Sequence, residues 1–158
     1  MTDFPTLAEL AAEEDELQLA RFTNEDAWTL GTALVTRARA EQLPVAIEVS
    51  RHSHQLFHAA MTGATLDNES WIQRKARVVH RFGHSSLYVG QRSREAGTTF
   101  EEQFGLDPQL FAGHGGGFPL IVRDVGPIGV VVVSGLPQVE DHRMVVTALR
   151  ELIAQQRS

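Results

Sequence analysis

A histidine followed by three glycines, His114-Gly115-Gly116-Gly117, is the local feature of this sequence with the clearest chemical potential. Successive glycines let a backbone approach a ligand closely and turn several N–H groups toward one anion. The same letters build the oxyanion hole of some esterases, but the G-x-S-x-G nucleophile motif of those enzymes is absent, as are the usual nucleotide-binding glycine patterns. The run predicts either a ligand-binding loop or a tight strand entry that requires glycine, and the residues alone leave both open.

Three histidines, His52, His54 and His58, lie close together in the sequence. The first two would share one face of a strand, and imidazole is a common metal ligand. No carboxylate motif accompanies them, and the first two fall at an expected turn. Exposed turn histidines are therefore favoured over a metal site, and we expect no metal centre.

A stripe of arginines, Arg74, Arg77 and Arg81, follows helical spacing, with Lys75 beside it. Guanidinium groups in a row can bind a carboxylate or a phosphate. A solvated face is the more common outcome, and ion pairing with the acidic N-terminal segment or with a second subunit is a further alternative. Trp71, at the start of the same helix, is expected in the core or at an interface.

Polar residues also gather where an apolar run ends and a helix is expected to begin. Ser134 and Gly135 close the run, and a helix that opens at Pro137 would offer free N–H groups and the positive end of its dipole. Asp141 and His142 in its early turns are candidates for catalysis, although Asp141 could equally complement the dipole. No Ser-His-Asp arrangement can be deduced from the spacing.

The helices that must position these residues follow from apolar spacing and from capping signals. They are expected over Leu7–Glu14, from Asn24 to about Gln42, from Asp67 or Asn68 to about Gln91, and from Pro137 to about Gln156. Shorter helical segments are expected from Thr99 to Gly105 and at Asp107-Pro108.

Alternating or continuous apolar runs predict the strands. They are expected at Leu17–Leu19, Val45–Val49, Gln55–Met61, Phe118–Arg123 and Ile128–Ser134, and the last is the most hydrophobic and is expected at the sheet centre. Two pairs of these strands form hairpins, and hairpins impose antiparallel pairing. The sequence thus predicts an α/β (α+β) fold, with an antiparallel sheet of about five strands and helices packed on it.

Length and charge limit the function classes. The chain has 158 residues, which suits a single domain over 1–158, with an acidic helical segment at 1–15. The formal charge of −6 argues against nonspecific nucleic-acid binding. The N-terminal segment lacks the pattern of a signal peptide, and the longest apolar stretch, near Ile128–Val133, is too short to span a membrane. Because there is no cysteine, we expect a cytoplasmic protein without disulfides or thiolate metal sites.

Several stretches together resemble a known family. They are Asn68-Glu69-Ser70-Trp71-Ile72-Gln73-Arg74-Lys75, Phe82-Gly83-His84-Ser85-Ser86, His114 through Leu120, Gly129 through Pro137, and Asp141-His142. In these motifs, from about Leu17 to Leu152, the sequence resembles the uncharacterised yeast-and-bacterial branch of the haem-degrading-domain superfamily, which includes GlcG-like and HbpS-like proteins.

The resemblance implies a profilin-like fold with a five-stranded antiparallel sheet, homo-oligomers, and haem binding or haem degradation. It supplies no haem-ligand motif, so the cofactor stays unknown, with haem as one option. Besides Trp71, the branch signature residues give the candidate ligand-binding set: Arg74, Lys75, His114, Gly115, Gly116, Gly117, Ser134 and Gly135.

Three functions compete at this point. The first is an oligomeric protein that binds haem or a small anionic ligand between the glycine run, Arg74 and Lys75, with His114 as the first choice of axial imidazole. The second is an oligomeric scaffold or accessory protein without catalysis, which would bind other proteins through exposed apolar residues. The third is a hydrolase or lyase.

The second and third functions each depend on named residues. A scaffold would expose apolar side chains at Leu7, Leu10 or Trp71. A hydrolase or lyase would use Asp141 and His142 together, so that both substitutions would abolish turnover. Whether any reaction is catalysed is left open.

Overall fold

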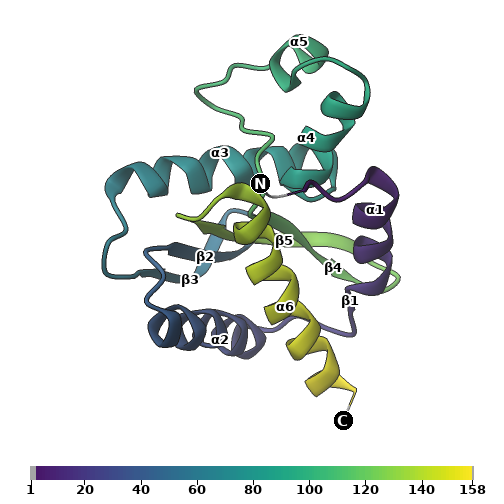
Figure 1. Cartoon of the computed structure of the whole chain (residues 1–158). Coiled ribbons are helices and arrows are strands. Elements are labelled where there is room, and N and C mark those ends of the chain that lie inside the picture. Colours follow the sequence, from purple (N-terminus) through teal and green to yellow (C-terminus); the bar gives the residue numbers. More distant parts are fainter. Residues whose placement is uncertain (1–2, 158) are drawn as a thin grey trace.

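The computed structural model describes residues 3–157, which form three layers with a five-stranded sheet in the middle (Figure 1). The strand order is β1-β4-β5-β2-β3. The strands are β1 (Gln18–Leu19), β2 (Ala46–Arg51), β3 (His54–Ala60), β4 (Gly117–Val122) and β5 (Gly126–Ser134). The expected antiparallel five-stranded sheet and the central place of the most hydrophobic strand are confirmed, while the short β1 pairs in parallel with β4.

Helices cover both faces of the sheet, as Figure 1 shows. The helices are α1 (Leu7–Glu16), α2 (Asn24–Glu41), α3 (Leu66–Phe82), α4 (Ser86–Glu95), α5 (Phe100–Phe104) and α6 (Gln138–Gln156). Helices α2 and α6 pack on one face, and α3 packs on the other with α4 and α5 beside it. Within residues 3–157, no helix is long and apolar enough to cross a membrane.

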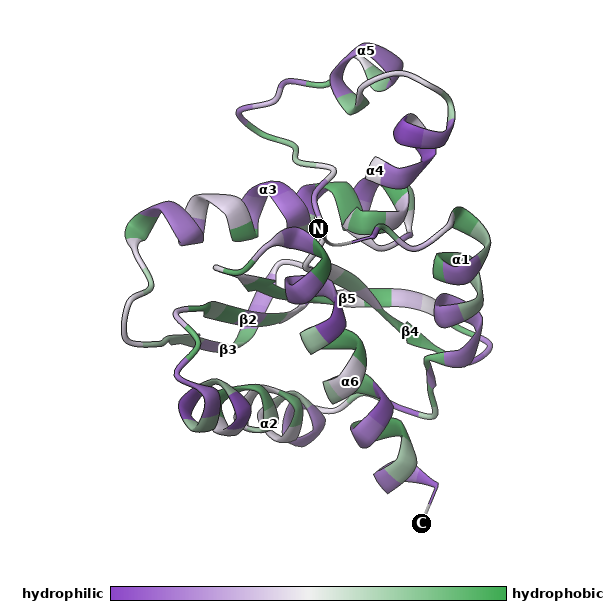
Figure 2. Cartoon of the chain, viewed as in Figure 1, coloured by the Kyte–Doolittle hydropathy of each residue, from purple (hydrophilic) through white to green (hydrophobic). Residues whose placement is uncertain are grey.

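Strand β5 supplies core residues to both faces because its valines alternate. Val131 and Val133 join the large core under α2 and α6, whereas Val130 and Val132 join a much smaller core under α3. A strand buried on both faces reads as a continuous run of β-branched residues, which is the pattern found in β5. In Figure 2 the central strands are accordingly mostly green, while the helices mix green with purple.

The segment expected as one helix up to about Gln91 is two helices, which corrects the prediction. Gly83 ends α3 in the left-handed conformation, with φ 70°, and its N–H donates to Val79 O over 2.9 Å. Ser85 then caps α4, since its Oγ accepts from Tyr88 N over 3.1 Å. Glycine after a helix and serine before the next are standard stop and start signals, so the sequence does contain the signal for a break between α3 and α4.

Two further boundaries differ from the prediction. Helix α3 begins after Thr65, so neither Asp67 nor Asn68 is its N-cap; instead Asn68 Oδ1 accepts from Thr65 N over 2.8 Å. At Asp107-Pro108 the chain makes a turn and no helix, with Leu110 N donating to Asp107 O over 3.0 Å.

Helix α1 is tied to the rest of the chain through three glutamates. Glu14 Oε1 lies 2.7 Å from His84 Nδ1 and Glu13 Oε1 lies 2.8 Å from His142 Nε2. Glu16 binds the guanidinium of Arg150 through both of its oxygens, at 2.6 and 3.0 Å. The acidic segment expected at 1–15 therefore pairs with α6 and with the turn before α4; its residues 1 and 2 lie outside the described part.

The apolar residues expected to be exposed for protein binding are not exposed. Leu10 is 1% exposed and packs against Leu87 and Val139. Leu7 and Trp71 are half-buried. The large apolar side chains that are exposed among the described residues are Phe4, Trp28, Leu66, Leu110 and Val125.

Candidate functional site

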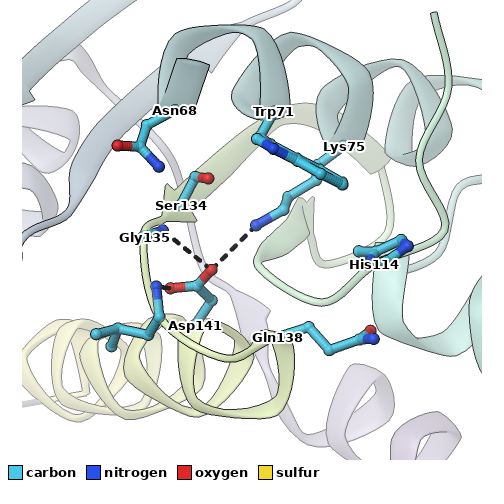
Figure 3. A pocket seen from close by; sticks show the side chains of 9 residues that line it. Asn68, Trp71, Lys75, His114, Ser134, Gly135, Gln138 and Asp141 are labelled. Atoms are coloured by element: carbon cyan, nitrogen blue, oxygen red, sulfur yellow. Dashed lines mark hydrogen bonds and ion pairs between the residues drawn. The ribbon is translucent and has the colours of Figure 1, made fainter. Parts of the chain in front are cut away.

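A pocket of about 280 Å³ opens where α3, the end of β5 and the start of α6 meet (Figure 3). Its lining residues come from segments far apart in the sequence: Asn68, Trp71, Lys75, His114, Ser134, Gly135, Leu136, Gln138 and Asp141. Four of these, Lys75, His114, Ser134 and Gly135, belong to the set predicted from the sequence. The fold therefore brings half of that set of eight to one cavity.

An ion pair between two buried side chains forms the floor of the pocket. Lys75 Nζ lies 3.1 Å from Asp141 Oδ2 and also donates to Val133 O over 3.1 Å (Figure 3). Burial lowers the pKa of Lys75, and the Asp141 carboxylate opposes that shift. Burial likewise raises the pKa of Asp141, against the effect of Lys75. Both shifts favour the neutral forms and bring the two groups closer to exchanging a proton.

The hydrogen-bonding capacity of Asp141 is used within the fold. Its Oδ1 accepts from Leu136 N over 3.0 Å, and its Oδ2 accepts from Gly135 N over 3.3 Å as well as from Lys75. Asp141 thus occupies the backbone amides between β5 and α6 that were expected to be free for a ligand. It fixes the turn at Gly135 and holds Lys75 in place.

The two amide side chains around this pair have their oxygen acceptors occupied and their N–H donors free. Asn68 Oδ1 accepts from Thr65 N, and Gln138 Oε1 accepts from Gly115 N over 3.0 Å. The amide nitrogens of Asn68 and Gln138, and the hydroxyl of Ser134, make no hydrogen bond with another residue in the described range. Figure 3 shows the Asn68 nitrogen on the side of the cavity. The pocket therefore offers donors and few acceptors.

The opposite wall of the pocket is aromatic. The rings of Trp71 and His114 lie with centroids 5.1 Å apart, and the guanidinium of Arg74 stacks over the Trp71 ring at 4.1 Å. The pKa of His114 is lowered, first by desolvation and then by the positive charges of Lys75, Arg74 and Arg94. At neutral pH the His114 imidazole is therefore uncharged among three cationic side chains.

Two of these cations have unused donors. Arg74 Nε and Arg94 Nη2 are buried and have no hydrogen-bond partner among residues 3–157. Arg94 is held by Gln91, which accepts from its Nε over 2.7 Å, and by the ring of Phe4 at 3.9 Å. Neither arginine lines this pocket: Arg74 and Arg94 each border a separate neighbouring hollow. They therefore add positive charge near the pocket without offering a donor inside it.

The glycine run contributes close packing. Gly115 N donates to Gln138, and Gly117 N donates to Ser86 Oγ over 3.0 Å. Gly116 has φ 132°, and a Cβ there would clash with Val133 O and lie 2.8 Å from Lys75 Nζ. These contacts favour the strand-entry interpretation, since two of the three amides are used within the fold. Direct contact of these glycines with a ligand stays a prediction.

The arginine stripe faces a loop of the same chain. Arg77 Nη1 donates to Leu110 O over 3.1 Å, and Arg81 lies 5.9 Å from the Phe111 ring. The Arg74 backbone carbonyl accepts from Ala112 N over 3.2 Å. Of the three arginines only Arg74 reaches the aromatic wall of the pocket, and none pairs with the N-terminal segment from residue 3 onward.

Asp141 and His142, proposed to act together, are separated by the helix that carries them. Asp141 lines the pocket, whereas the buried His142 is bound to Glu13 and lines no part of it. Successive residues of a helix point in different directions, so the two side chains do not meet.

The clustered histidines do not converge on a metal site. His52 lies in the β2–β3 turn with φ 53°, and His58 Nε2 lies 2.7 Å from Glu69 Oε1. No group of three or more His, Asp or Glu side chains suited to a metal ion occurs in the described part of the chain.

Sequence reasoning missed Asn68, Gln138 and Arg94, and it placed Asp141 in the wrong partnership. Asn68 was available as a residue of the recognised motif, but its role depends on capping α3 at Thr65. One sequence signal pointed to the site and was overlooked: Lys75 is the only lysine in the chain.

Comparisons with known proteins agree on the relatives of this chain. The family model described as "Haem degrading protein HbpS-like" matches residues 22–150. A UPF0303 protein of Streptomyces coelicolor is 56% identical over 151 residues, which is 96% of each chain. The crystal structure of the Ybr137w protein is 36% identical, with a TM-score of 0.89 over 99% of this chain and 92% of that one. A PduOC–haem complex shares the fold, with 22% identity and a TM-score of 0.67 over 82% and 93% of the two chains.

Proposed function

This chain belongs to the family of HbpS-like haem degrading proteins, and within that family we propose that it binds a small anionic ligand in the pocket above Lys75 and Asp141. One observation carries the proposal. The fold uses the acceptor oxygens of Asn68, Gln138 and Asp141 and leaves donors facing the cavity. A site lined with unused donors is complementary to a ligand rich in acceptors, such as a carboxylate.

The charges around the pocket support an anion. The whole chain carries −6, yet Lys75, Arg74 and Arg94 all act on His114. Asp141 neutralises Lys75. Within residues 3–157 the arginine ion pairs involve Arg21, Arg37 and Arg150, so no carboxylate pairs with Arg74 or Arg94 there. The only acidic side chain that acts appreciably on His114 is Glu101, and its effect is the smallest of those resolved. A local excess of positive charge on an acidic protein steers anions to that place.

A haem group does not fit inside this pocket. The cavity of about 280 Å³ is at the lower limit of the roughly 300–1,000 Å³ that drug-sized ligands occupy, and a haem is larger than most of those ligands. A haem would have to lie against the surface outside the cavity, where His114 is the available imidazole. The residues that line the cavity suit a smaller molecule.

Calorimetric titration with small carboxylates tests the proposal. Pyruvate, lactate and succinate are the probes, and the matching neutral amides are the controls. The acids should bind and the amides should not. Arg74→Gln should weaken acid binding about 3- to 10-fold, because it removes a positive charge that lies behind the Trp71 ring and not in the pocket itself. Arg77→Gln is the matched control, since Arg77 lies on the same helix and, within residues 3–157, donates only to the Leu110 carbonyl. Equal binding of acids and amides, or no binding of any acid, would refute the proposal.

A haem titration followed by absorbance separates the haem alternative. We expect no saturable, shifted Soret band. A band that saturates and is lost in His114→Ala would transfer the assignment from small acids to haem.

Homo-oligomers, a cytoplasmic location and a scaffold role remain predictions. Light scattering of the purified protein tests the first. A protein partner that is still captured by Arg74→Gln and Lys75→Arg variants would support the scaffold role over ligand binding.

A further inference from the structure

The only lysine of the chain lies inside the proposed ligand pocket, and we propose that its amine condenses with a carbonyl group of the ligand to form a Schiff base. The inference rests on the proposed function, because it needs a ligand in this pocket. It goes further by assigning a covalent step to Lys75 and by naming the ligand class: a small acid that also carries an aldehyde or ketone.

The composition indicates that an amine is needed at this position. Of the 14 basic residues, only Lys75 is lysine, and every other cation of the protein is arginine. Arginine cannot be deprotonated under ordinary conditions, whereas a buried lysine can become a neutral nucleophile. A lysine is rarely buried, yet Lys75 is 3% exposed.

The geometry leaves one side of the amine open to the cavity. An ammonium group has three N–H donors, and Lys75 uses two of them on Val133 O and Asp141 Oδ2. The third has no partner among residues 3–157, and Lys75 lines the pocket. The absence of a side chain at Gly116 provides the space for Nζ, because a Cβ there would lie 2.8 Å from it.

Asp141 is placed to move the protons that the reaction requires. The Lys75 ammonium gives one proton to the Asp141 carboxylate, and the free amine adds to the carbonyl carbon of the ligand. Proton exchange within the adduct gives a neutral carbinolamine, and the Asp141 carboxylic acid then protonates its hydroxyl, which leaves as water. The products are a protonated imine, one water molecule and the original carboxylate, so atoms and charge balance.

The surroundings favour this proton exchange. Desolvation lowers the pKa of Lys75 and raises that of Asp141, so both shifts favour the neutral amine and the neutral acid. Lysines activated by desolvation are a recognised source of Schiff-base nucleophiles.

The pocket also limits the size and the functional groups of the ligand. Free donors of Asn68, Ser134 and Gln138 surround the amine and can hold the carboxylate while the carbonyl faces Nζ. A volume of about 280 Å³ admits a short-chain acid. Short 2-oxo acids meet both conditions.

Borohydride trapping tests the inference. The protein is incubated with glyoxylate, pyruvate or 2-oxobutyrate, reduced with sodium borohydride, and analysed by intact mass and peptide mapping. Because Lys75 is the only lysine, the 2-oxo acid can form an imine only with the Lys75 amine or with the N-terminal amine. We expect a stoichiometric adduct on the peptide containing Lys75, unchanged in Arg77→Gln and lost in Lys75→Arg. Peptide mapping of the unaltered protein gives the answer even if Lys75→Arg fails to fold.

Lactate separates failure of Schiff-base formation from failure of anion binding. It has the same carboxylate as pyruvate, but a hydroxyl group replaces the ketone. If lactate and pyruvate both bind by calorimetry and no 2-oxo acid labels Lys75, the covalent step is wrong and anion binding stands. If no acid binds and Lys75 is not labelled, both proposals fail. An adduct confined to the N-terminal amine also overturns the Lys75 assignment.

Discussion

The two faces of the sheet are built for different tasks. The face under α2 and α6 is covered by the larger core, in which residues such as Leu30, Val131 and Leu149 are almost completely buried. The face under α3 has a small apolar core and several buried polar side chains, among them Glu48 and Lys75. Apolar burial is the main source of stability, so the first face stabilises the fold. The second face has less apolar burial because it holds polar groups near a cavity. Below, the face under α2 and α6 is called the apolar face and the face under α3 the polar face.

The largest expected effect comes from breaking the ion pair of the polar face. Asp141→Asn leaves the buried Lys75 without its counter-ion and should lower the free energy of unfolding by about 3–5 kcal/mol. Urea denaturation measures the change. A ligand carboxylate can replace Asp141 as the counter-ion of Lys75, so saturating pyruvate should restore part of the lost stability. Replacing both partners, Lys75→Met with Asp141→Leu, should recover much of the stability. It also removes the Lys75 amine from the pocket, so carboxylate binding should be lost. If binding survived in the double variant, the polar face would not be the ligand-binding face.

A core substitution on the apolar face should have a similar or somewhat smaller effect on stability and none on binding. Leu30→Ala removes a fully buried side chain of α2 and should cost about 2–5 kcal/mol. Urea denaturation gives the stability, and calorimetry on the folded variant should give an unchanged affinity for pyruvate. An affinity that fell with stability would show that the two faces are coupled.

The smallest expected effect is a pH dependence at the edge of the polar face. The pKa of His114 is lowered in the folded protein, so the unfolded chain binds a proton first as the pH falls through about 6.5. The stability associated with neutral His114 is thus present above about pH 6.5 and is lost as the pH falls toward the folded pKa. Calorimetric melting at pH 7.5 and 5.5 should show a smaller acid loss in His114→Gln than in the unaltered protein. An identical loss in both would place the acid sensitivity elsewhere.

Much of the fold, and part of the pocket, could be predicted from the sequence. The run of valines before Ser134 identified the central strand, because such a run is buried on both faces wherever it lies. The motif residues Lys75, His114, Ser134 and Gly135 line one cavity, and that they bind a ligand there stays a prediction.

The remainder depended on contacts between distant segments. Asp141 meets Lys75 across 66 positions of sequence, and no local pattern reports such a pairing. The glycine run correctly indicated that other atoms approach its backbone closely. Those atoms belong to other residues of the same chain, such as Val133 and Gln138. The break at Gly83 was different, since glycine followed by Ser85 was a local signal that a continuous apolar spacing obscured.

Because Lys75 is the only lysine, the protein has a single internal cleavage site for proteases that cut after lysine. The Lys75–Ala76 bond lies inside α3, where a protease cannot bind it while the helix is packed on the sheet. Digestion by a lysine-specific protease should therefore proceed only through opening of the α3 face, and it should yield two fragments. When opening is fast relative to cleavage, the digestion rate reports the population of the open form. One residue thus makes the conformational opening of this face measurable on an ordinary gel.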